Sequence, residues 1–296
     1  MGADLSPQAA RITRQARGRR ARRASWLAAR SGFAPLTVGL ATSTSATSDA
    51  GLLDALNQAD AVVNLAGEPI AEKRWTPAHR QLLETSRLET TSQLVKAIEA
   101  CATPPKVLVN ASAIGFYGSS LDKRFLESST PGDDFLASLC ERWEAAAEAV
   151  PSSVRQVTLR IGIVLAADGG ALGKMLPVFR TGFGGPIGSG RQWMSWIHRS
   201  DLCALILQSL TDESWSGVIN AVAPEPVSMT AFCKQLGRSL GRPSLLPVPA
   251  PVLQVLLGDG AKVVLEGQQV ASERLEGLNF SFRYPDLASA LAAATS

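Results

Sequence analysis

The sequence has few of the residues from which metal sites and disulfide frameworks are built. Its 296 residues include only two histidines and four cysteines, and no two cysteines form a CxxC pair. A zinc cluster and a disulfide scaffold are therefore excluded. Isolated thiols of this kind are typical of small core residues in a reducing compartment. We accordingly expect no bound metal and a cytoplasmic location, with a plastid as the less favoured alternative.

Long apolar runs are also lacking. A transmembrane helix needs roughly 18 consecutive apolar residues, and the best candidate, Leu245 to Leu257, is shorter and carries three prolines. We therefore expect no membrane partner. The composition, 46% hydrophobic and 19% charged, is that of an ordinary soluble globular protein. The length fits one large domain or two modest ones.

Positive charge is concentrated at one end of the chain. Residues 1–48 hold eight arginines against one acid, Asp4, whereas the remainder has 21 basic and 25 acidic residues. The body is thus mildly acidic, and its charge gives no reason to expect a nucleic-acid partner. The arginine-rich stretch also lacks interleaved aromatic residues.

Residues 1–48 differ from the rest in composition, and we expect them to be disordered. They are rich in Arg, Ala and Ser and have no helical period of large apolar residues. Three interpretations remain open: an organelle transit peptide, a basic arm for anionic partners, or a segment that is not the native N-terminus. Our hypothesis is the third, because translation of GC-rich DNA in the wrong reading frame gives sequences rich in Arg, Ala and Ser.

From residue 49 onward, strand and helix patterns alternate. A short helical face at 52–56 precedes them, and the helix at 199–211 has a serine-capped start. This alternation predicts an α/β fold with a parallel sheet and right-handed crossovers. Strands are expected at 60–67, 106–111, 154–165 and 218–222, and helices at 77–100, 134–149, 199–211, 228–240, 249–257, 261–270 and 286–294.

Two motifs follow strands where ligands commonly bind. In the first, residues 64–67 (NLAG) place small side chains at a strand end, where a flat ligand can lie against the backbone. Glu68 follows and can accept a hydrogen bond from a ribose. In the second, Ser112 and Tyr117 lie in ASAIGFYG, where a serine can polarise a substrate group. The alternative interpretations are a tight turn and a packed aromatic pair.

Two further motifs carry polar residues in apolar surroundings. Arg160 lies inside a predicted strand and needs a partner, which is either a phosphate or acid in a cleft or an internal ion pair. The segment 188–198 contains Arg191, Trp196 and His198, which together could line a pocket. Its alternative interpretation is a glycine loop before a short strand, with the tryptophans in the core.

Taken in order, these segments resemble a known family. They include NLAGE, SRLETT, ASAIGFYG, DFLASLCERWEAAA, LRIGIVLAADGGALGKML, GGPIGSGRQWMSWIHRSDL and NAVAPEPVSMTAF. Together they resemble the atypical short-chain dehydrogenase/reductases of the NAD-dependent epimerase/dehydratase type. Within these, the chain is most similar to the "epimerase family protein" subgroup, sometimes labelled cell-division inhibitor. The resemblance extends over about residues 50–294 and includes the subgroup's small C-terminal domain.

The resemblance implies a doubly wound Rossmann sheet that lacks its first strands, with a small, mostly helical C-terminal domain. The implied division is 1–48, 49–225 and 226–296. The implied cofactor is NADP(H) or NAD(H), and the substrate is an unknown small molecule. The residues carried over are Asn64, Ala66, Gly67, Glu68, Arg87 and Arg160 for the cofactor, Ser112 and Tyr117 for catalysis, and Arg191, Trp196 and His198 for the substrate.

Two family features have no counterpart here. Most members use a tyrosine and a lysine four residues apart on the helix after the serine strand, because the lysine lowers the pKa of the tyrosine. The matching stretch is Phe135 to Leu139, which cannot do this chemistry. The glycine fingerprint that binds the pyrophosphate is also absent from residues 1–48. We expect the strand at 60–67 to be an exposed edge, with marginal stability, aggregation and weakened dinucleotide binding.

Three functions follow as hypotheses. The first is an NADP(H)-dependent oxidoreductase or epimerase-like enzyme. The second is a dinucleotide-binding regulator without turnover, acting on cell or plastid division. The third is an inactive product of a frameshifted N-terminus. A hydrolase is disfavoured because the sequence has no GxSxG elbow. The sequence does not define an oligomeric state.

Overall fold

The computed structural model of the protein describes residues 49–295. Predictions about residues 1–48 lie outside the described residues. The described chain is built on a four-stranded parallel sheet in the order β1-β2-β4-β8. Its strands are β1 (Ala61–Asn64), β2 (Val107–Ala113), β4 (Arg155–Ile161) and β8 (Gly217–Ala221). The predicted α/β fold with a Rossmann-like parallel sheet is confirmed.

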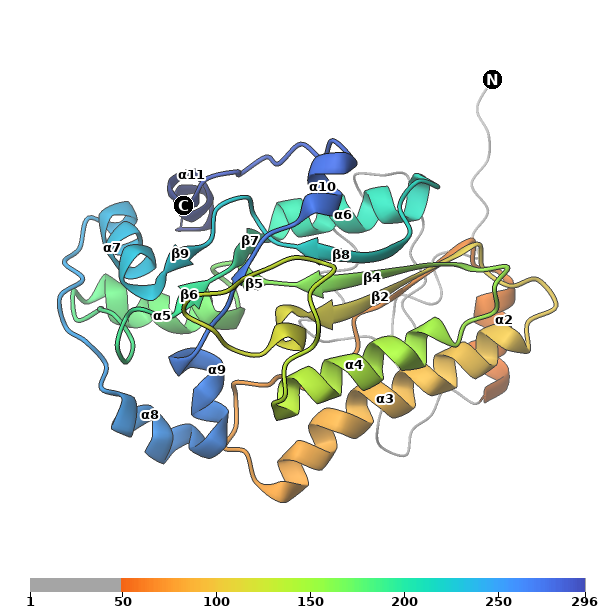
Figure 1. The fold of residues 1–296 in the computed structure, drawn as a ribbon, viewed down its shortest axis with the longest axis horizontal. Coiled ribbons are helices and arrows are strands. Elements are labelled where there is room, and N and C mark those ends of the chain that lie inside the picture. Colours follow the sequence, from red (N-terminus) through yellow and green to blue (C-terminus); the bar gives the residue numbers. More distant parts are fainter. Residues whose placement is uncertain (1–48, 296) are drawn as a thin grey trace, which may run out of the picture.

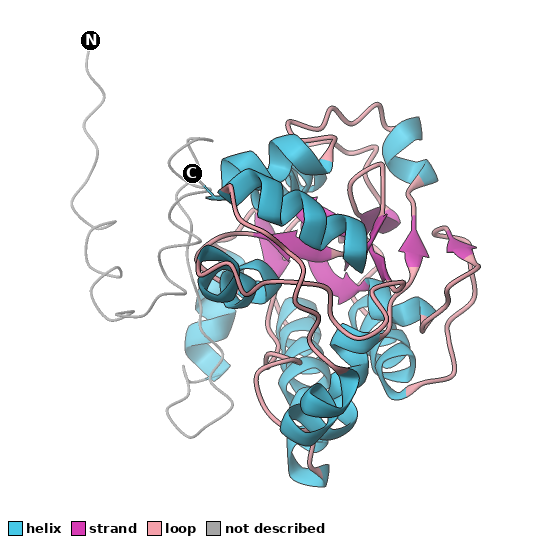
Figure 2. Ribbon diagram, turned by 90° about the vertical axis from the view of Figure 1, so that its left-hand side faces the viewer, coloured by secondary structure: helices cyan, strands magenta, loops and turns pink. Residues whose placement is uncertain are grey.

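Helices cover both faces of this sheet (Figures 1 and 2). On one face lie α3 (Pro77–Glu99) and α4 (Phe135–Glu148), and on the other lies α6 (Arg199–Thr211). The short helix α2 (Asp49–Asn57) packs beside α3. The central strands β2 and β4 bury side chains on both faces, the polar Asn110, Ser112, Thr158 and Arg160 among them.

The core follows the two-residue period of the strands. Val107 and Val109 point to one side of β2 and pack in a cluster with Leu205 of α6. Leu108, between them, points to the other side and packs with Ile98 of α3. The predicted positions of the long helices and central strands therefore match the structure to within a few residues.

Part of the first strand, β1, is exposed. Only Asn64 of β1 is buried, whereas Val63 and the following Leu65 are 37% and 54% exposed. Within the described residues β1 has a neighbouring strand, β2, on one side alone. This arrangement agrees with the expectation that the strand forms an edge, and it explains why an apolar sequence is exposed here.

Three further predictions need correction. The strand predicted at 154–165 is divided into β4 and β5 (Ile163–Leu165) by Gly162. Helix α6 begins after His198, whose Nδ1 accepts from the Ser200 amide, so its cap is not a serine. The helix predicted at 261–270 is instead η4 (Gly258–Ala261), α9 (Lys262–Leu265) and β10 (Gln269–Val270).

Two helices were not predicted. Helix α5 (Gly170–Arg180) starts at a pair of glycines and contains Pro177, which conceals its helical pattern. Helix α10 (Glu273–Gly277) is too short to show a period. The remaining elements are η3 (Ile114–Tyr117), β3 (Arg124–Phe125), β6 (Trp193–Met194), β7 (Trp196–His198), β9 (Val227–Ser228), α7 (Met229–Leu240), α8 (Ala250–Leu257) and α11 (Leu287–Thr295).

The mostly helical C-terminal region returns to the main sheet through a short segment at 268–271. The Ser195 hydroxyl donates to the Gln268 carbonyl at 2.8 Å and accepts from the Val270 amide at 2.9 Å. Strand β10 also pairs in parallel with β3. None of the helices in residues 49–295 has both the length and the apolar character needed to cross a bilayer.

Gly162 is closely packed against the backbone of Ser195 and the side chain of Val222. A Cβ added there would lie 2.6 Å from the Ser195 carbonyl oxygen and 2.9 Å from a Val222 methyl carbon. We expect Gly162→Ala to lower the free energy of unfolding by about 1–3 kcal/mol, because the backbone must shift. Urea unfolding measures this. Gly277→Ala is the matched control, since its Cβ would meet nothing within 4 Å. Equal effects of the two changes would contradict the packing described.

Candidate functional site

The end of β1 is shaped by a buried asparagine. The Asn64 side-chain nitrogen donates to the Thr91 hydroxyl at 2.9 Å and to the Asn110 side-chain oxygen at 2.7 Å. Its own oxygen accepts from the Ala66 amide at 3.2 Å. Asn64 therefore fixes the start of the predicted cofactor loop against β2 and α3, and it is not itself part of the exposed loop surface because its side chain is buried.

Arg87 of α3 is packed against this loop. Its Nη2 donates to the Glu68 carbonyl at 2.9 Å and its Nη1 donates to the Leu83 carbonyl at 3.0 Å. Its guanidinium carbon lies 5.2 Å from the centroid of the Trp143 ring. A Cβ added at Gly67 would lie 2.9 Å from that guanidinium carbon, which explains the glycine. The structure thus brings Gly67, Glu68 and Arg87 together.

The electrostatics of Arg87 reflect its partial burial. Desolvation lowers its pKa from the ordinary value, and the nearby Cys140 and Glu68 act in the opposite direction. An arginine remains protonated under such shifts. The loop after β1 is therefore bordered by one fixed positive charge.

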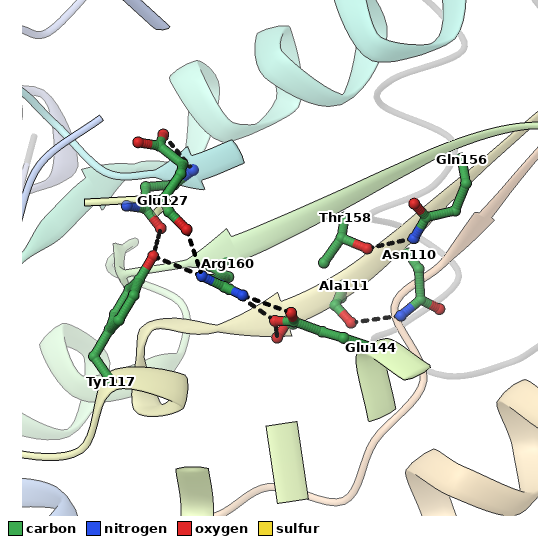
Figure 3. A network of polar contacts seen from close by, with 10 residues as sticks. Asn110, Ala111, Tyr117, Glu127, Glu144, Gln156, Thr158 and Arg160 are labelled. Atoms are coloured by element: carbon green, nitrogen blue, oxygen red, sulfur yellow. Dashed lines mark hydrogen bonds and ion pairs between the residues drawn. The ribbon is translucent and has the colours of Figure 1, made fainter. Parts of the chain in front are cut away.

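Arg160 is held in an internal ion pair (Figure 3). Its Nε and Nη2 donate to the two carboxylate oxygens of Glu144 at 2.9 and 2.8 Å, and both side chains are 6% exposed. Its Nη1 donates to the Tyr117 hydroxyl at 2.9 Å and to the Glu127 carbonyl at 3.3 Å. The sequence left open whether Arg160 pairs with a ligand in a cleft or with an internal acid. In the structure it pairs with an internal acid, Glu144.

Ser112 and Tyr117 belong to the same network. The Ser112 hydroxyl donates to Glu144 at 2.5 Å, and the Tyr117 hydroxyl donates to the Asn220 side-chain oxygen at 2.7 Å. The Tyr117 ring stacks on Phe125 with centroids 5.3 Å apart. Ser112 and Tyr117 are only 3% and 2% exposed. These contacts match the packed-aromatic interpretation, and a catalytic role for either residue stays a prediction.

Burial is the largest influence on the Tyr117 hydroxyl, and it raises the pKa of this group. The charge and hydrogen bond of Arg160 act in the opposite direction but do not cancel it. A tyrosine that transfers protons near neutral pH needs a lowered pKa. Tyr117 therefore differs in environment from the catalytic tyrosine of most family members.

The helix positions nearest this network hold apolar residues. A Cβ added at Gly115 would lie 3.5 Å from the Leu136 Cβ and 4.0 Å from the Cys140 sulfur. Leu136 and Cys140 each lie one residue after Phe135 and Leu139, which stand on α4 at the positions matched to the tyrosine and lysine of most family members. Burial raises the pKa of the Cys140 thiol to about 12, and Glu144 adds to the rise. This pair offers neither a phenol nor a cation.

The predicted substrate residues lie apart from the loop after β1. Trp196 is fully buried in a core cluster with Phe232, as the alternative interpretation predicted. Arg191 is exposed on the loop before β6. The centroids of the His198 and Tyr284 rings are 4.1 Å apart, and both residues line a cavity of about 340 Å³. Burial lowers the pKa of His198.

Across residues 49–295, no hydrogen bond or ion pair joins these three residues to Glu68, Arg87 or the Arg160 network. The same part of the chain contains no group of three or more His, Cys, Asp or Glu side chains arranged to hold a metal ion. The residues that the structure does gather are thus those of the loop after β1 and those around Arg160.

Sequence reasoning missed Glu144. Its position in an amphipathic helix is typical of a surface acid. One signal could have found it, because Cys140, Glu144 and Ala147 fall on one helical face and all three are buried. A charged residue in such a stripe requires a buried partner, and Arg160 in its apolar strand is the obvious one.

Comparison with known proteins gives two family matches. The NAD dependent epimerase/dehydratase family matches residues 11–221. A domain of unknown function, DUF1731, matches residues 248–294. The first match alone extends over more than half of the chain.

Individual relatives agree with these matches. The chain is 48% identical over 235 residues to the Arabidopsis thaliana "Epimerase family protein SDR39U1 homolog, chloroplastic", covering 79% of this chain and 67% of that protein. It is 42% identical to the Mus musculus "Epimerase family protein SDR39U1", covering 78% and 80%. The crystal structure of the human SDR39U1 (isoform 2) with NADPH is 40% identical, with a TM-score of 0.78, and the match covers 82% of this chain and 85% of that one.

The buried ion pair can be tested by unfolding. Arg160→Met leaves the Glu144 carboxylate buried without its cation, so we expect a loss of about 3–5 kcal/mol in the free energy of unfolding. Adding Glu144→Leu should recover part of this loss, because the uncompensated charge is removed. Arg142→Met breaks the exposed pair with Glu84 and should cost less than about 1 kcal/mol. A double variant no more stable than Arg160→Met would contradict this account.

The raised pKa of Tyr117 makes a prediction about alkaline stability. The folded protein holds this proton more tightly than the unfolded chain does. Its contribution to stability is therefore complete below the unfolded pKa of about 10 and is lost as pH rises above it. We expect Tyr117→Phe to show a smaller alkaline loss of stability than the unchanged protein, measured by urea unfolding across pH. Tyr284→Phe retains Tyr117 and should keep the full loss. Identical profiles for both variants would refute the assignment.

Proposed function

The chain belongs to the NAD-dependent epimerase/dehydratase family, and on that basis we propose that it binds NADP(H) at the carboxyl edge of its parallel sheet. We further propose that it acts as an NADP(H)-dependent oxidoreductase or epimerase-like protein on a small molecule. The observation that carries the proposal is the cluster of Gly67, Glu68 and Arg87 after β1. A relative 40% identical to this chain has been crystallised with NADPH.

The residues of this cluster fit a dinucleotide. Gly67 leaves the space beside Arg87 without a side chain, so a flat group can approach the backbone there. Two nitrogens of Arg87 donate to backbone carbonyls, and a guanidinium carries further N–H groups that can bond an anionic or hydroxyl group. The Glu68 carboxylate can accept from a ribose hydroxyl. NADP(H) would supply a hydride donor or acceptor when bound.

A second candidate function is favoured by the environment of α4. Phe135 and Leu139 stand on α4 where a tyrosine and a lysine would be needed for the usual proton transfer. Ser112 already donates to Glu144, and Tyr117 already donates to Asn220. These contacts favour a dinucleotide-binding regulator without turnover. A role in cell or plastid division remains part of this second proposal alone.

Two further proposals are retained. The protein is placed in the cytoplasm rather than in a plastid, although one plant relative is labelled chloroplastic. The hypothesis of a frameshifted N-terminus concerns residues outside the described part of the chain. It predicts weak or absent dinucleotide binding, so the same experiment addresses it.

Calorimetric titration with NADPH and NADH tests the proposal. We expect NADPH to bind more tightly than NADH. Arg87→Met should weaken NADPH binding by about tenfold or more, because a charge-assisted hydrogen bond is lost. Arg142→Met is the matched control, since Arg142 is an exposed arginine on α4 that pairs with Glu84. Its affinity should equal that of the unchanged protein.

The outcomes separate the hypotheses. Binding together with steady NADPH oxidation over a panel of carbonyl compounds supports an enzyme. Binding without turnover supports the regulator. Absence of NADPH binding, or equal affinities of the Arg87→Met and Arg142→Met proteins at equal thermal stability, would overturn the proposed site.

A further inference from the structure

Exposed apolar side chains are concentrated in one part of the molecule. Of the ten large apolar side chains that are exposed in residues 49–295, seven come from two segments, 178–183 and 245–256. We call these seven the C-terminal apolar patch. They are Val178, Phe183, Leu245, Leu246, Val252, Val255 and Leu256.

Backbone hydrogen bonds bring the two segments together. The Leu246 amide donates to the Gly184 carbonyl at 3.3 Å, and the Val248 amide donates to the Pro186 carbonyl at 2.9 Å. The ring of Pro243 lies against Gly182, with 3.7 Å to a Cβ added there. Residues 182–186 therefore run beside residues 243–248, which places the exposed Phe183 in a segment next to the one that carries Leu245 and Leu246.

Helix α8 extends this surface. None of its residues is buried, and Val252, Val255 and Leu256 are 48%, 70% and 62% exposed. The helix is anchored through its backbone, because Arg74 donates to the Val255 carbonyl at 2.7 Å and the Trp75 amide donates to the Leu257 carbonyl at 3.2 Å. It lies at the end of the molecule opposite α2 (Figure 1). A helix with this sequence exposes more apolar area than folding alone requires.

Basic residues adjoin the patch. Between Asp168 and Asp201, and between Glu225 and Asp259, the sequence contains seven basic residues, of which Arg199 is paired with Asp168, although the chain after residue 48 is acidic as a whole. Arg180 and Arg242 are exposed and adjoin the patch in sequence, and Arg74 reaches α8. The acid that follows α8, Asp259, is paired with Arg80. The patch is thus apolar with a cationic border.

This combination selects one kind of partner. Two cavities of the described residues, around His198 and along residues 88–96 of α3, are lined by other segments and not by residues of the patch. An exposed apolar helix face bordered by Arg and Lys is typical of elements that lie in the interface of an anionic bilayer.

We propose that the C-terminal apolar patch is a docking surface for an anionic lipid bilayer, with α8 lying in the plane of the interface. The absence of a spanning helix is consistent with this mode, because the protein lies on the bilayer and does not cross it. The expectation of no membrane partner rested on the lack of a long apolar run, which excludes only spanning segments. The proposal does not depend on NADP(H) binding.

Co-sedimentation of the full chain with vesicles tests the apolar side of the proposal. The vesicles are phosphatidylcholine alone, or phosphatidylcholine mixed with phosphatidylglycerol. We expect binding to the mixed vesicles and little binding to phosphatidylcholine alone. The double change Val255→Ser with Leu256→Ser should lower partitioning by about tenfold or more, because two inserted apolar side chains are removed. Leu121→Ser, at an exposed apolar residue outside the patch, is the matched control.

The cationic border is tested separately. Arg180→Gln and Arg242→Gln should each lower partitioning into the mixed vesicles about fivefold, which is the effect of one basic charge near an anionic surface. Lys123→Gln, at an exposed lysine distant in sequence from both segments, should have little effect. Raising the salt concentration should weaken binding of the unchanged protein.

Several results would overturn the proposal. These are no binding to the mixed vesicles, equal binding to both vesicle types, or equal losses in the patch variants and their controls. Light scattering provides another test. If the unchanged protein is a dimer and Val255→Ser with Leu256→Ser makes it a monomer, a second copy covers the patch and the bilayer proposal fails. Circular dichroism and thermal unfolding confirm that each variant is folded.

Discussion

The described fold depends on the buried pair between Arg160 and Glu144. Arg160 lies near the carboxyl end of the interior strand β4, and Glu144 reaches it from α4 with both carboxylate oxygens. Two charges removed from water are stable only when their geometry and remaining hydrogen bonds are good. Here the remaining bonds come from Ser112 on β2, Tyr117 on η3 and the Glu127 carbonyl. One ion pair therefore connects two strands, one helix and the loop that follows β2.

The same constraint reaches the C-terminal region. Tyr117 donates to Asn220 on β8, and the Asn220 side chain donates to the Ala271 carbonyl at 2.8 Å. The Glu127 carboxylate accepts from the Asn220 amide at 3.0 Å and also from the Ser272 hydroxyl. Ala271 and Ser272 are thus joined to Arg160 through Tyr117, Asn220 and Glu127.

The sequence predicted the sheet and its long helices because their periods are long and regular. The positions of β2, β4, β8, α3 and α4 follow from apolar residues that packing between helices on both faces requires. That β1 forms an edge was expected from the missing first strands, whereas the exposure of Val63 depends on its neighbours rather than on its own pattern. The sequence could not place α5, since glycines and a proline interrupt the helical signal.

For the site, the sequence indicated residues but not their partners. Arg160 in an apolar strand required an opposite charge or a ligand, and only the fold selects Glu144. Gly67 was predicted as a small residue beside a flat ligand, with a tight turn as the alternative, and the structure adds the guanidinium of Arg87, 20 residues later, which leaves no room for a Cβ. Trp196 was grouped with Arg191 and His198 because they are close in sequence. All three residues of β7 are buried, and Trp196 packs in a core cluster with Phe232, which its sequence position alone does not show.

The sequence of α8 predicts that it forms a helix but not that the helix is exposed. A run such as residues 250–257 predicts a helix, and an apolar helix is ordinarily expected to be buried. In the structure no residue of α8 is buried, and the helix is held by Arg74 and Trp75 through its backbone carbonyls. Those two residues directly precede α3, the helix that also carries Arg87. The loop after β1 and the exposed helix are therefore connected through residues 66–74, which form neither helix nor strand and of which none is buried.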